Sequence, residues 1–499
     1  MGERKKVIVI GGGVAGMTAA IYAAEAGFSC EIFEKHDRPG GNLTGWRRDG
    51  YTIDNCIHWL TGSHPGSPLY GMWQKTGMLS DTVPLHRAPV FYESEWEGKR
   101  LALDASPERT RRRMWELSPA DHREIDRFID TVLAVIPWMT GGRIPEKAKL
   151  LPHLPDLLFY RRTDLYSLAD RFRHPLLRLL MTDYIGGEFS AVALIAAYAA
   201  FASGNGSVPA GGSPAAAERM RQVCLQNGCI FHTGCAVRRI VVRNGVATGI
   251  LTEDGTFFPA DELIAACDPQ VTFGRLLPAE WMPQAMKERL NRPEIPGFSS
   301  IHAAFSCDRQ ALRPFGTRII SAPYFSSRSG GRLPVREFSA EPTFAPPGKV
   351  VLQTLVFQTA EESAEWIALA KNPSAYRERK ALVGEQMRAV IAAQIPELSQ
   401  SLRLLDVWTP ATYEGYFGNP GGAYLSFAMT PRTPLSKLPR HTPHVRNLVL
   451  ATQWLTSPGG LPSAALAGKR AAEDLWEEGS LLPAENPAGG LSASPRRVG

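Results

Sequence analysis

The sequence lacks long hydrophobic runs and paired cysteines. Its longest apolar run, from Ala191 to Ala202, is shorter than the ~18 residues that a membrane-spanning helix needs. The seven cysteines are odd in number, include no C-x-x-C pair and are spread along the chain, which argues against a disulfide or zinc framework. The first apolar run, Val7 to Ile10, is too short for a signal peptide. We therefore expect a cytoplasmic protein without a metal site.

The chain also lacks internal repeats and a large charge of one sign. It carries 55 Lys and Arg against 49 Asp and Glu, a net charge of +6. Residues 99–178 hold 16 of the basic and 11 of the acidic side chains, so +5 of this surplus lies in one segment. A nucleic-acid-binding protein is usually more basic and carries a recognisable module. We expect no nucleic-acid partner, and an anionic membrane surface is the better candidate for this segment.

What the sequence has is the length and composition of a globular protein with several domains. Its 499 residues exceed one compact core, and 44% hydrophobic with 21% charged residues is ordinary for a folded chain. Two long segments with little glycine separate three stretches of strand and helix signals, and we expect these segments to be mostly helical. We predict a nucleotide-binding domain from residues 1–85, 205–275 and 405–478, a second domain from 86–204 and 276–404, and a disordered tail over 479–499.

A glycine-rich turn near the amino terminus has the pattern of a dinucleotide-binding site. Gly11-x-Gly13-x-x-Gly16 follows a predicted strand over 6–10 and opens a predicted helix over 15–26. The glycines permit a tight turn, close approach of a pyrophosphate and close packing of the helix. Glu34, 18 residues past Gly16, is placed to accept hydrogen bonds from ribose hydroxyls. With the neighbouring Ala15 and Lys35 these residues predict a nucleotide site; a glycine turn without a ligand is the alternative.

Further motifs follow in a fixed order along the chain. They are Pro39-Gly40-Gly41-Asn42, Gly50-Tyr51-Thr52-Ile53-Asp54, Gly211-Gly212-Ser213, Val237, Asn419-Pro420-Gly421-Gly422-Ala423-Tyr424, and Gln453-Trp454 with Pro458-Gly459-Gly460-Leu461-Pro462. In this order the chain resembles the flavin-dependent phytoene desaturase, carotenoid isomerase and retinol saturase family, relatives of the flavin amine oxidases. The resemblance covers nearly the whole chain and is more specific for the superfamily than for the substrate.

The resemblance implies an α/β fold with α+β insertions. A Rossmann-like FAD-binding domain of the glutathione-reductase type would carry a second, substrate-binding domain. FAD would be the cofactor, with its pyrophosphate on the glycine turn and its ribose on Glu34. The resemblance also assigns the phosphate path to Gly40, Gly41 and Asn42, adenine recognition to the backbone of Val237, and the flavin ring to Gln453, Gly460, Leu461 and Pro462. A helix that begins beside the ring would stabilise the negative charge of reduced flavin.

Two side chains are candidates for the chemistry. His58 lies in a segment that the resemblance places beside the flavin, where a histidine can move a proton at neutral pH. A histidine that only hydrogen-bonds to backbone or flavin is the alternative. Tyr424 would donate a hydrogen bond from the substrate side, or is a packed aromatic. The chain departs from the family at Asn42, where many relatives have Arg, so a charge contact to the cofactor is lost or made by another residue.

The implied reaction is hydride transfer between flavin N5 and a carbon of a long apolar, unsaturated substrate such as a carotenoid, retinoid or isoprenoid, by a desaturase, saturase or isomerase. A flavin amine oxidase and a non-enzymatic isoprenoid-binding protein on the same fold are the alternatives. A second G-x-G-x-x-G is lacking, so we expect an unidentified electron acceptor or donor instead of a second stable nucleotide site. Leucines at helical spacing in residues 145–164 predict a lid or core helix, or an interfacial helix that contacts the inner face of a membrane.

Overall fold

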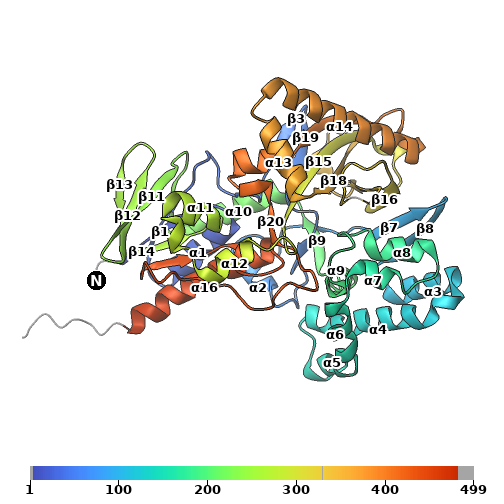
Figure 1. The fold of residues 1–499 in the computed structure, drawn as a ribbon, viewed down its shortest axis with the longest axis horizontal. Coiled ribbons are helices and arrows are strands. Elements are labelled where there is room, and N and C mark those ends of the chain that lie inside the picture. Colours follow the sequence, from blue (N-terminus) through green and yellow to red (C-terminus); the bar gives the residue numbers. More distant parts are fainter. Residues whose placement is uncertain (1–3, 329, 482–499) are drawn as a thin grey trace, which may run out of the picture.

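A five-stranded parallel sheet lies at the centre of the lobe that holds the first and last helices (Figure 1). The computed structural model describes residues 4–328 and 330–481. The strand order of this sheet is β10, β2, β1, β14 and β21. Its members are β1 (Lys6–Ile10), β2 (Ser29–Phe33), β10 (Ile230–His232), β14 (Glu262–Ala265) and β21 (Leu448–Leu450). The sheet therefore assembles three parts of the sequence that lie far apart.

The two faces of this sheet pack against different layers. Val7 and Val9 of β1 belong to one core with the helices, and Ile8 and Ile10 belong to another core with a small antiparallel sheet. The helices are α1 (Val14–Glu25), α10 (Gly212–Gln226) and α16 (Leu461–Leu481), and the small sheet is β11 (Val237–Arg243), β12 (Val246–Thr252) and β13 (Phe257–Pro259). Burial on both faces explains why β1 is a continuous apolar run instead of an alternating one.

The strand predicted over 6–10 forms with those bounds, and the helix predicted over 15–26 runs from Val14 to Glu25. Strands β11 and β12 are joined by Asn244-Gly245, and both turn residues have the positive φ that a tight hairpin needs. Helix α1 packs closely on α16, because a Cβ at Gly468 would lie only 2.1 Å from the Ala15 carbonyl oxygen. A glycine at this position lets the first and last helices touch backbone to backbone.

A second, larger sheet forms another lobe and corrects the expectation that residues 276–404 are mostly helical. Its order is β19, β15, β18, β17, β16, β7 and β8, and β20 pairs with β15. The strands are β7 (Val90–Trp96), β8 (Lys99–Asp104), β15 (Gly297–Asp308), β16 (Thr317–Ser321), β17 (Arg332–Glu337), β18 (Lys349–Gln358), β19 (Arg403–Trp408) and β20 (Leu425–Phe427). The long strands β15 and β18 are almost wholly buried, so they show no alternation that separates a strand from a helix. Helices α13 (Ala360–Leu369) and α14 (Pro373–Gln394) pack on this sheet.

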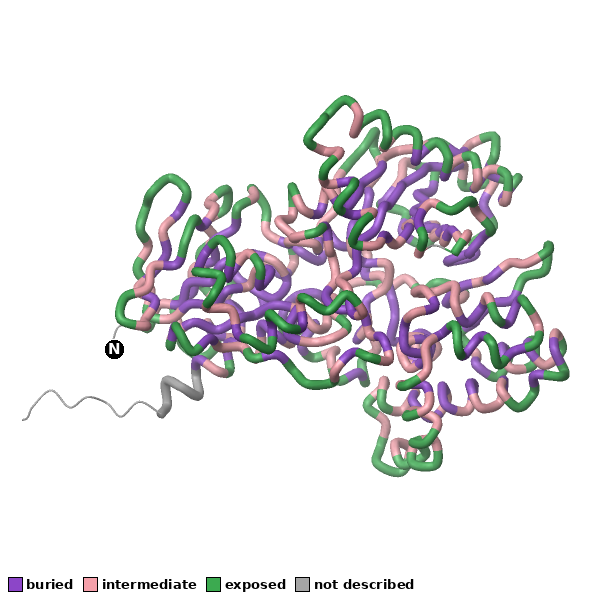
Figure 2. The backbone as a smooth tube through the Cα atoms, in the orientation of Figure 1, coloured by how far each residue is buried: buried purple, intermediate pink, exposed green. Residues whose placement is uncertain are grey.

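The third lobe is helical, as the sequence predicts for much of residues 86–204 (Figure 1). It contains α3 (Pro107–Leu117), α4 (His122–Met139), α5 (Ile144–Ala148), α6 (Leu154–Arg162), α7 (Leu165–Ala169), α8 (Pro175–Thr182) and α9 (Ala191–Ala202). Figure 2 shows that the tip with α5 and α6 is largely exposed. The core-helix interpretation of residues 145–164 is therefore wrong for Leu151, Leu154 and Leu158, which are exposed to solvent.

Short elements join the lobes. A sheet of β5 (Leu60–Thr61), β9 (Gly206–Pro209) and β6 (Leu85–His86) and a hairpin of β3 (Gly45–Arg48) and β4 (Tyr51–Asp54) lie between them. The remaining short helices are α2 (Tyr70–Lys75), α11 (Pro269–Val271), α12 (Gln284–Leu290) and α15 (Pro410–Thr412). Within the described residues, no helix combines the length and apolar composition that crossing a bilayer requires.

The last residues of α16 overlap the tail that was predicted over 479–499. The helix continues to Leu481, so residues 479–481 are helical where disorder was expected. The rest of the predicted tail, 482–499, lies outside the described residues. The division of the chain into domain segments stays a prediction.

Candidate functional site

The glycine-rich turn stands at the carboxyl end of β1. Gly11 has a φ of +104°, a conformation that favours glycine. A Cβ at Gly16 would lie 1.9 Å from the Gly11 carbonyl oxygen, so a side chain at Gly16 would push α1 away from the turn. Gly13 pairs with Gly40 in a parallel bridge, and the Gly40 amide donates to the Gly12 carbonyl oxygen at 2.8 Å. The two predicted glycine loops therefore meet directly.

A cavity of about 270 Å³ opens where these loops meet the parallel sheet. We call it the cofactor cavity. Most predicted site residues line it, namely Gly11, Gly13, Ala15, Glu34, Lys35, Gly40, Gly41, Asn42, Val237, Tyr424, Gln453, Gly460 and Leu461. Gly16 and Pro462 are not among the lining residues, and His58 lies in a second cavity. The fold thus gathers residues from both ends of the chain, whereas the individual role of each residue stays a prediction.

Two residues after β2 shape one wall of the cofactor cavity. The buried Glu34 carboxylate accepts hydrogen bonds from the Gly12 amide at 2.9 Å and the His36 amide at 3.0 Å. The Lys35 ammonium donates to the Tyr416 carbonyl oxygen at 2.7 Å, and burial lowers the pKa of Lys35. The two amide contacts hold the Glu34 carboxylate in one orientation at the cavity wall, and its contact with a ribose stays a prediction.

Asn42 joins three segments beneath the cavity. Its side-chain amide donates to the Tyr424 carbonyl oxygen at 3.0 Å, and its Oδ1 accepts from the Asn419 amide at 3.1 Å. Its own carbonyl oxygen accepts from the Asn55 side chain at 3.0 Å. Asn42 is therefore a hydrogen-bonding junction. Arg275, which sequence reasoning missed, lines the same cavity and forms an ion pair with Glu253 at 2.6 Å.

The closing motif brings the amino end of α16 to the cavity. The Gly460 amide donates to Gln453 Oε1 at 2.7 Å, and Gln453 Nε2 donates to the Tyr424 carbonyl oxygen at 3.1 Å. Helix α16 begins at Leu461, and Pro462 occupies its first turn, where a missing N–H costs nothing. The helix amino end is a fixed source of positive potential at the cavity wall.

Asp268 is a buried carboxyl group in the cavity wall that sequence reasoning missed. It follows β14, and its Oδ1 accepts from the Gln270 amide at 2.7 Å as the cap of a short helix. Its Oδ2 is buried without a hydrogen-bond partner among the described residues. Burial raises the pKa of Asp268 to about 7. A buried oxygen of this kind at a cavity wall is suited to a polar atom of a ligand. The only sequence signal is Asp before Pro, which indicates a helix cap.

A second missed group is a buried polar network centred on His302 of β15. Its Nε2 lies 2.5 Å from the Ser300 hydroxyl and 3.3 Å from the Tyr413 hydroxyl, which donates to Asn55 at 2.9 Å. The His302 ring stacks on Trp408 with centroids 4.9 Å apart. Burial lowers the pKa of His302 to about 3, so the imidazole is neutral. These residues come from distant segments that no local pattern connects.

The segment that contains His58 is rigidly held. Asp54 Oδ1 accepts from the amides of Cys56 at 2.8 Å and Ile57 at 2.9 Å, and its Oδ2 accepts from the Ser213 amide at 2.6 Å. Cys56 lines the cofactor cavity, and His58 lies in the second cavity. Burial, and then the charge of Arg336, lowers the pKa of His58 well below its ordinary value. The ring is therefore neutral and a weak base, with one N–H to donate and one nitrogen to accept a hydrogen bond.

The second cavity, of about 330 Å³, has mainly aromatic and aliphatic walls. Trp59, Phe91, Phe201, Val208 and Phe338 are its larger apolar lining residues. A Cβ at Gly206 would lie 2.1 Å from the Trp59 ring, so the indole rests directly on β9. This contact fixes the aromatic wall next to His58.

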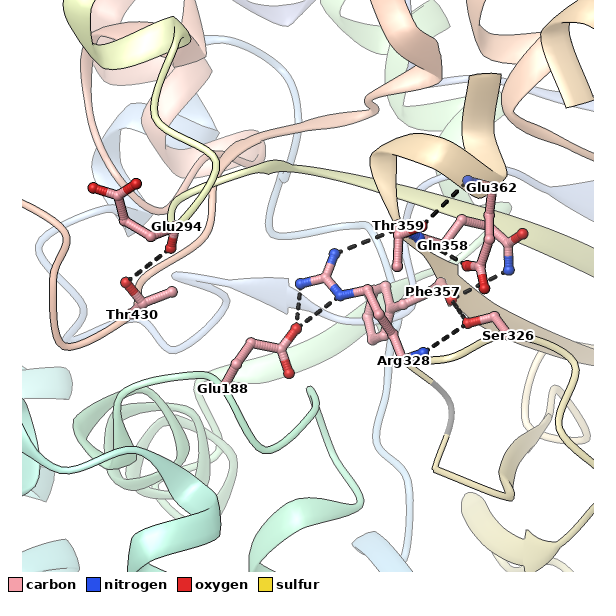
Figure 3. A network of polar contacts seen from close by, with 9 residues as sticks. All are labelled: Glu188, Glu294, Ser326, Arg328, Phe357, Gln358, Thr359, Glu362 and Thr430. Carbon is pink, nitrogen blue, oxygen red and sulfur yellow. Dashed lines mark hydrogen bonds and ion pairs between the residues drawn. The ribbon is translucent and has the colours of Figure 1, made fainter. Parts of the chain in front are cut away.

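A third, larger cavity of about 920 Å³ lies among the lobes and is more polar. Figure 3 shows its central contact, in which the Arg328 side chain reaches Glu188. Arg328 Nε lies 2.8 Å from Glu188 Oε1, and Arg328 Nη1 donates to the Gln358 carbonyl oxygen at 3.4 Å. Glu188 precedes α9 and Gln358 ends β18, so this contact joins the helical lobe to the larger sheet.

Two glycine loops, two helix amino ends and the unpaired Asp268 oxygen fit an elongated nucleotide cofactor. The family described as flavin containing amine oxidoreductase matches residues 14–476. The chain belongs to this family. The family is described as flavin containing, and this oxidoreductase has FAD as its cofactor.

Curated relatives of this flavin oxidoreductase have carotenoid-related names. A 4,4'-diapolycopene oxygenase of Methylomonas sp is 24% identical over 94% of this chain and 97% of its own length. A 4,4'-diaponeurosporene oxygenase of Staphylococcus haemolyticus is 22% identical over 95% of this chain and 97% of its own length. The matches extend over nearly the whole of each protein, as the order of motifs implies.

Solved structures share the fold. An oxidoreductase from Methanosarcina mazei superposes with a TM-score of 0.59 at 18% identity, covering 94% of this chain and 100% of that one. A putrescine oxidase double mutant has a TM-score of 0.59 at 16% identity, covering 95% and 99%. A flavin-binding oxidoreductase fold of mixed α/β content is therefore established. Its assignment to the glutathione-reductase type stays a prediction.

Proposed function

We propose that this flavin oxidoreductase transfers a hydride between flavin N5 and a carbon of a long apolar, unsaturated substrate, as a desaturase, saturase or isomerase. The observation that carries the proposal is the second cavity. Its walls are mainly apolar, and its lining residue His58 follows Cys56, which lines the cofactor cavity, by only two residues. The diapolycopene and diaponeurosporene in the relatives' names support this substrate class. FAD, when bound, supplies the hydride acceptor or donor.

The chain's own residues would orient the substrate and exclude water. The contacts of Asp54 keep the segment between the two cavities rigid, which favours alignment of a reacting C–H bond. His58 is proposed to handle the proton that accompanies the hydride; because its pKa is lowered, it would hold that proton only transiently. Burial raises the pKa of Tyr424, so its hydroxyl keeps its proton and can donate a hydrogen bond.

The test is anaerobic mixing of the oxidised and the reduced FAD-loaded protein with carotenoid, retinoid, steroid and fatty-acid polyenes. We expect a change of flavin colour with one class and a product that differs in mass by two hydrogens, or an isomer. His58→Gln and Tyr424→Phe should keep the flavin spectrum but slow the reaction. Absence of flavin absorption bands after reconstitution with FAD would contradict the proposal. Peroxide release with simple amines would favour an amine oxidase, and prenyl-lipid binding without FAD would favour a carrier.

We also propose that the exposed tip of the helical lobe contacts an anionic membrane surface. Trp138, Ile144, Leu151, Leu154 and Leu158 are 45–84% exposed in this tip. The exposed cations Arg143 and Lys149 lie on the same short stretch. Exposed apolar side chains with cations beside them are suited to contact an anionic membrane surface, from which an apolar substrate could be taken up.

This contact can be measured by co-sedimentation with vesicles. We expect binding to vesicles that contain an anionic phospholipid and weaker binding to vesicles of phosphatidylcholine alone. The double variant Leu154→Ser/Leu158→Ser should lose binding, whereas Leu382→Ser, a change at an exposed leucine of α14, should keep it. Equal binding by both variants would contradict the proposal.

A further inference from the structure

The second cavity carries more positive charge than its apolar walls suggest. Arg87, Arg309 and Arg336 all line it. Arg87 and Arg309 are exposed, whereas Arg336 is partly buried and lies beside His58. Within the part of the chain that the structure describes, none of the three has a carboxylate at ion-pair distance. Glu337 and Glu341 also line the cavity, so the three guanidinium groups leave a surplus of one positive charge there, without ion pairs at the guanidinium groups.

The two glutamates in the cavity wall are already occupied. Glu337 accepts from the Gly316 amide at 3.0 Å and from the Ser339 amide at 2.7 Å. Glu341 accepts from the Gly211 amide at 2.9 Å and lies 3.3 Å from a ring nitrogen of His86. Both carboxylates keep their negative charge, and that of Glu337 favours the Arg336 cation through space, but neither forms an ion pair with a guanidinium of the cavity. The guanidinium N–H groups therefore stay available to a ligand.

Arg336 is held in place by the fold. It lies on β17, paired with Thr317 of β16 and Gln353 of β18, in the interior of the larger sheet. Its Nη1 donates to the His58 carbonyl oxygen. Burial lowers the pKa of Arg336 to about 10, so the group is still a cation at neutral pH. A planar guanidinium fixed in this way has the geometry that a carboxylate recognises with two parallel hydrogen bonds.

We infer that the second cavity binds an apolar chain that ends in a carboxylate, with the carboxylate on Arg336 and the chain against Trp59, Phe91 and Phe201. The inference rests on the proposed function and narrows its substrate class to polyenes that carry an acidic end. A fully neutral hydrocarbon would leave the partly buried Arg336 without an ion pair and with only the through-space charge of Glu337 to stabilise it, which is less favourable than a bound carboxylate. A carboxylate on Arg336 would also lie next to the His58 segment and fix the distance of the chain from the cofactor cavity.

The experiment compares two probes that differ only in charge. Binding of the fluorescent polyene cis-parinaric acid and of its methyl ester is measured by probe fluorescence with FAD-loaded protein. We expect the acid to bind at least about tenfold more tightly than the ester, since a charge-assisted pair is lost with the ester. In Arg336→Gln this preference should vanish. Arg336→Lys keeps the positive charge but not the two parallel N–H donors of the guanidinium group, so the preference for the acid should be partly retained.

Arg112→Gln, a change at an exposed arginine of α3, is the matched control and should keep the full preference. Equal binding of acid and ester by the unaltered protein, binding of neither, or an unchanged preference in a folded Arg336→Gln would overturn the inference. The comparison within the unaltered protein decides the matter even where a variant does not fold. Because binding is read from the probe and not from flavin turnover, a failed hydride-transfer assay is a separate result.

Discussion

Asp268 offers a prediction about how stability depends on pH. Its carboxyl group is buried in the wall of the cofactor cavity, and burial raises its pKa from an ordinary 3.8 to about 7. The folded protein therefore keeps a proton on Asp268 between about pH 4 and pH 7 that the unfolded chain releases. The contribution of Asp268 to the free energy of unfolding is fully present below pH 4. It falls as the pH rises from 4 to 7, and above pH 7 it is lost and changes no further.

The size of the effect follows from the window. Between pH 5 and pH 8 the contribution of Asp268 to the free energy of unfolding falls over about two pH units, from pH 5 to the pKa of about 7. Each unit corresponds to ~1.4 kcal/mol, so the protein loses ~3 kcal/mol of stability. In Asp268→Asn the side chain is neutral at every pH, so this contribution disappears. The variant should lose less stability than the unaltered protein between pH 5 and pH 8.

The assay is urea denaturation of the protein without FAD at pH 5 and pH 8, followed by tryptophan fluorescence. Asp37→Asn changes an exposed aspartate and serves as the control, which should behave like the unaltered protein. FAD retention gives a second readout, because an ionised Asp268 beside an anionic cofactor weakens binding at pH 8 but not in Asp268→Asn. The same pH dependence in the unaltered protein and Asp268→Asn would refute the reasoning.

Three further predictions concern the glycine turn, its support and the lobes. Gly16→Ala should abolish FAD binding, since its Cβ would clash with the Gly11 carbonyl, whereas Gly71→Ala meets no atom within 4 Å and should leave FAD absorbance unchanged. Asn42→Ala removes two side-chain hydrogen bonds at ~1 kcal/mol each and should weaken FAD binding at least about tenfold by titration; unchanged affinity would contradict its role as a junction. Arg328→Gln removes a partly exposed ion pair with Glu188, so the thermal midpoint should fall by no more than about 1 °C while limited proteolysis between the lobes speeds up.

The parts of the fold that the sequence predicts are those with local signals. The strand, glycine turn and helix that begin the chain carry their own spacing, and the Asn244-Gly245 hairpin carries its turn residues. The strands β15 and β18 were missed because a strand buried on both faces has the same apolar run as a buried helix.

The candidate functional site also has residues that the sequence predicts and residues that it does not. Gly13, Glu34 and Asn42 lie in motifs and meet at one cavity. The importance of Asp268 comes from a buried oxygen without a hydrogen bond among the described residues, and that of Arg336 from a partly buried cation at a cavity wall. Burial and pairing are properties of the folded chain, so no spacing in the sequence indicates them. His58 was placed beside the flavin by resemblance, and the structure puts it in the neighbouring cavity.

The contact between α1 and α16 has a consequence for how the chain is synthesised. The first helix completes its packing only when Gly468 and the rest of the last helix have left the ribosome, and β14 has one edge unpaired until β21 has been made. Contacts this distant in sequence make folding slow and leave apolar surface unprotected in the meantime. A nascent or truncated chain that lacks α16 has lost Leu461 and Ala464 from the wall of the cofactor cavity, together with the helix amino end that faces it.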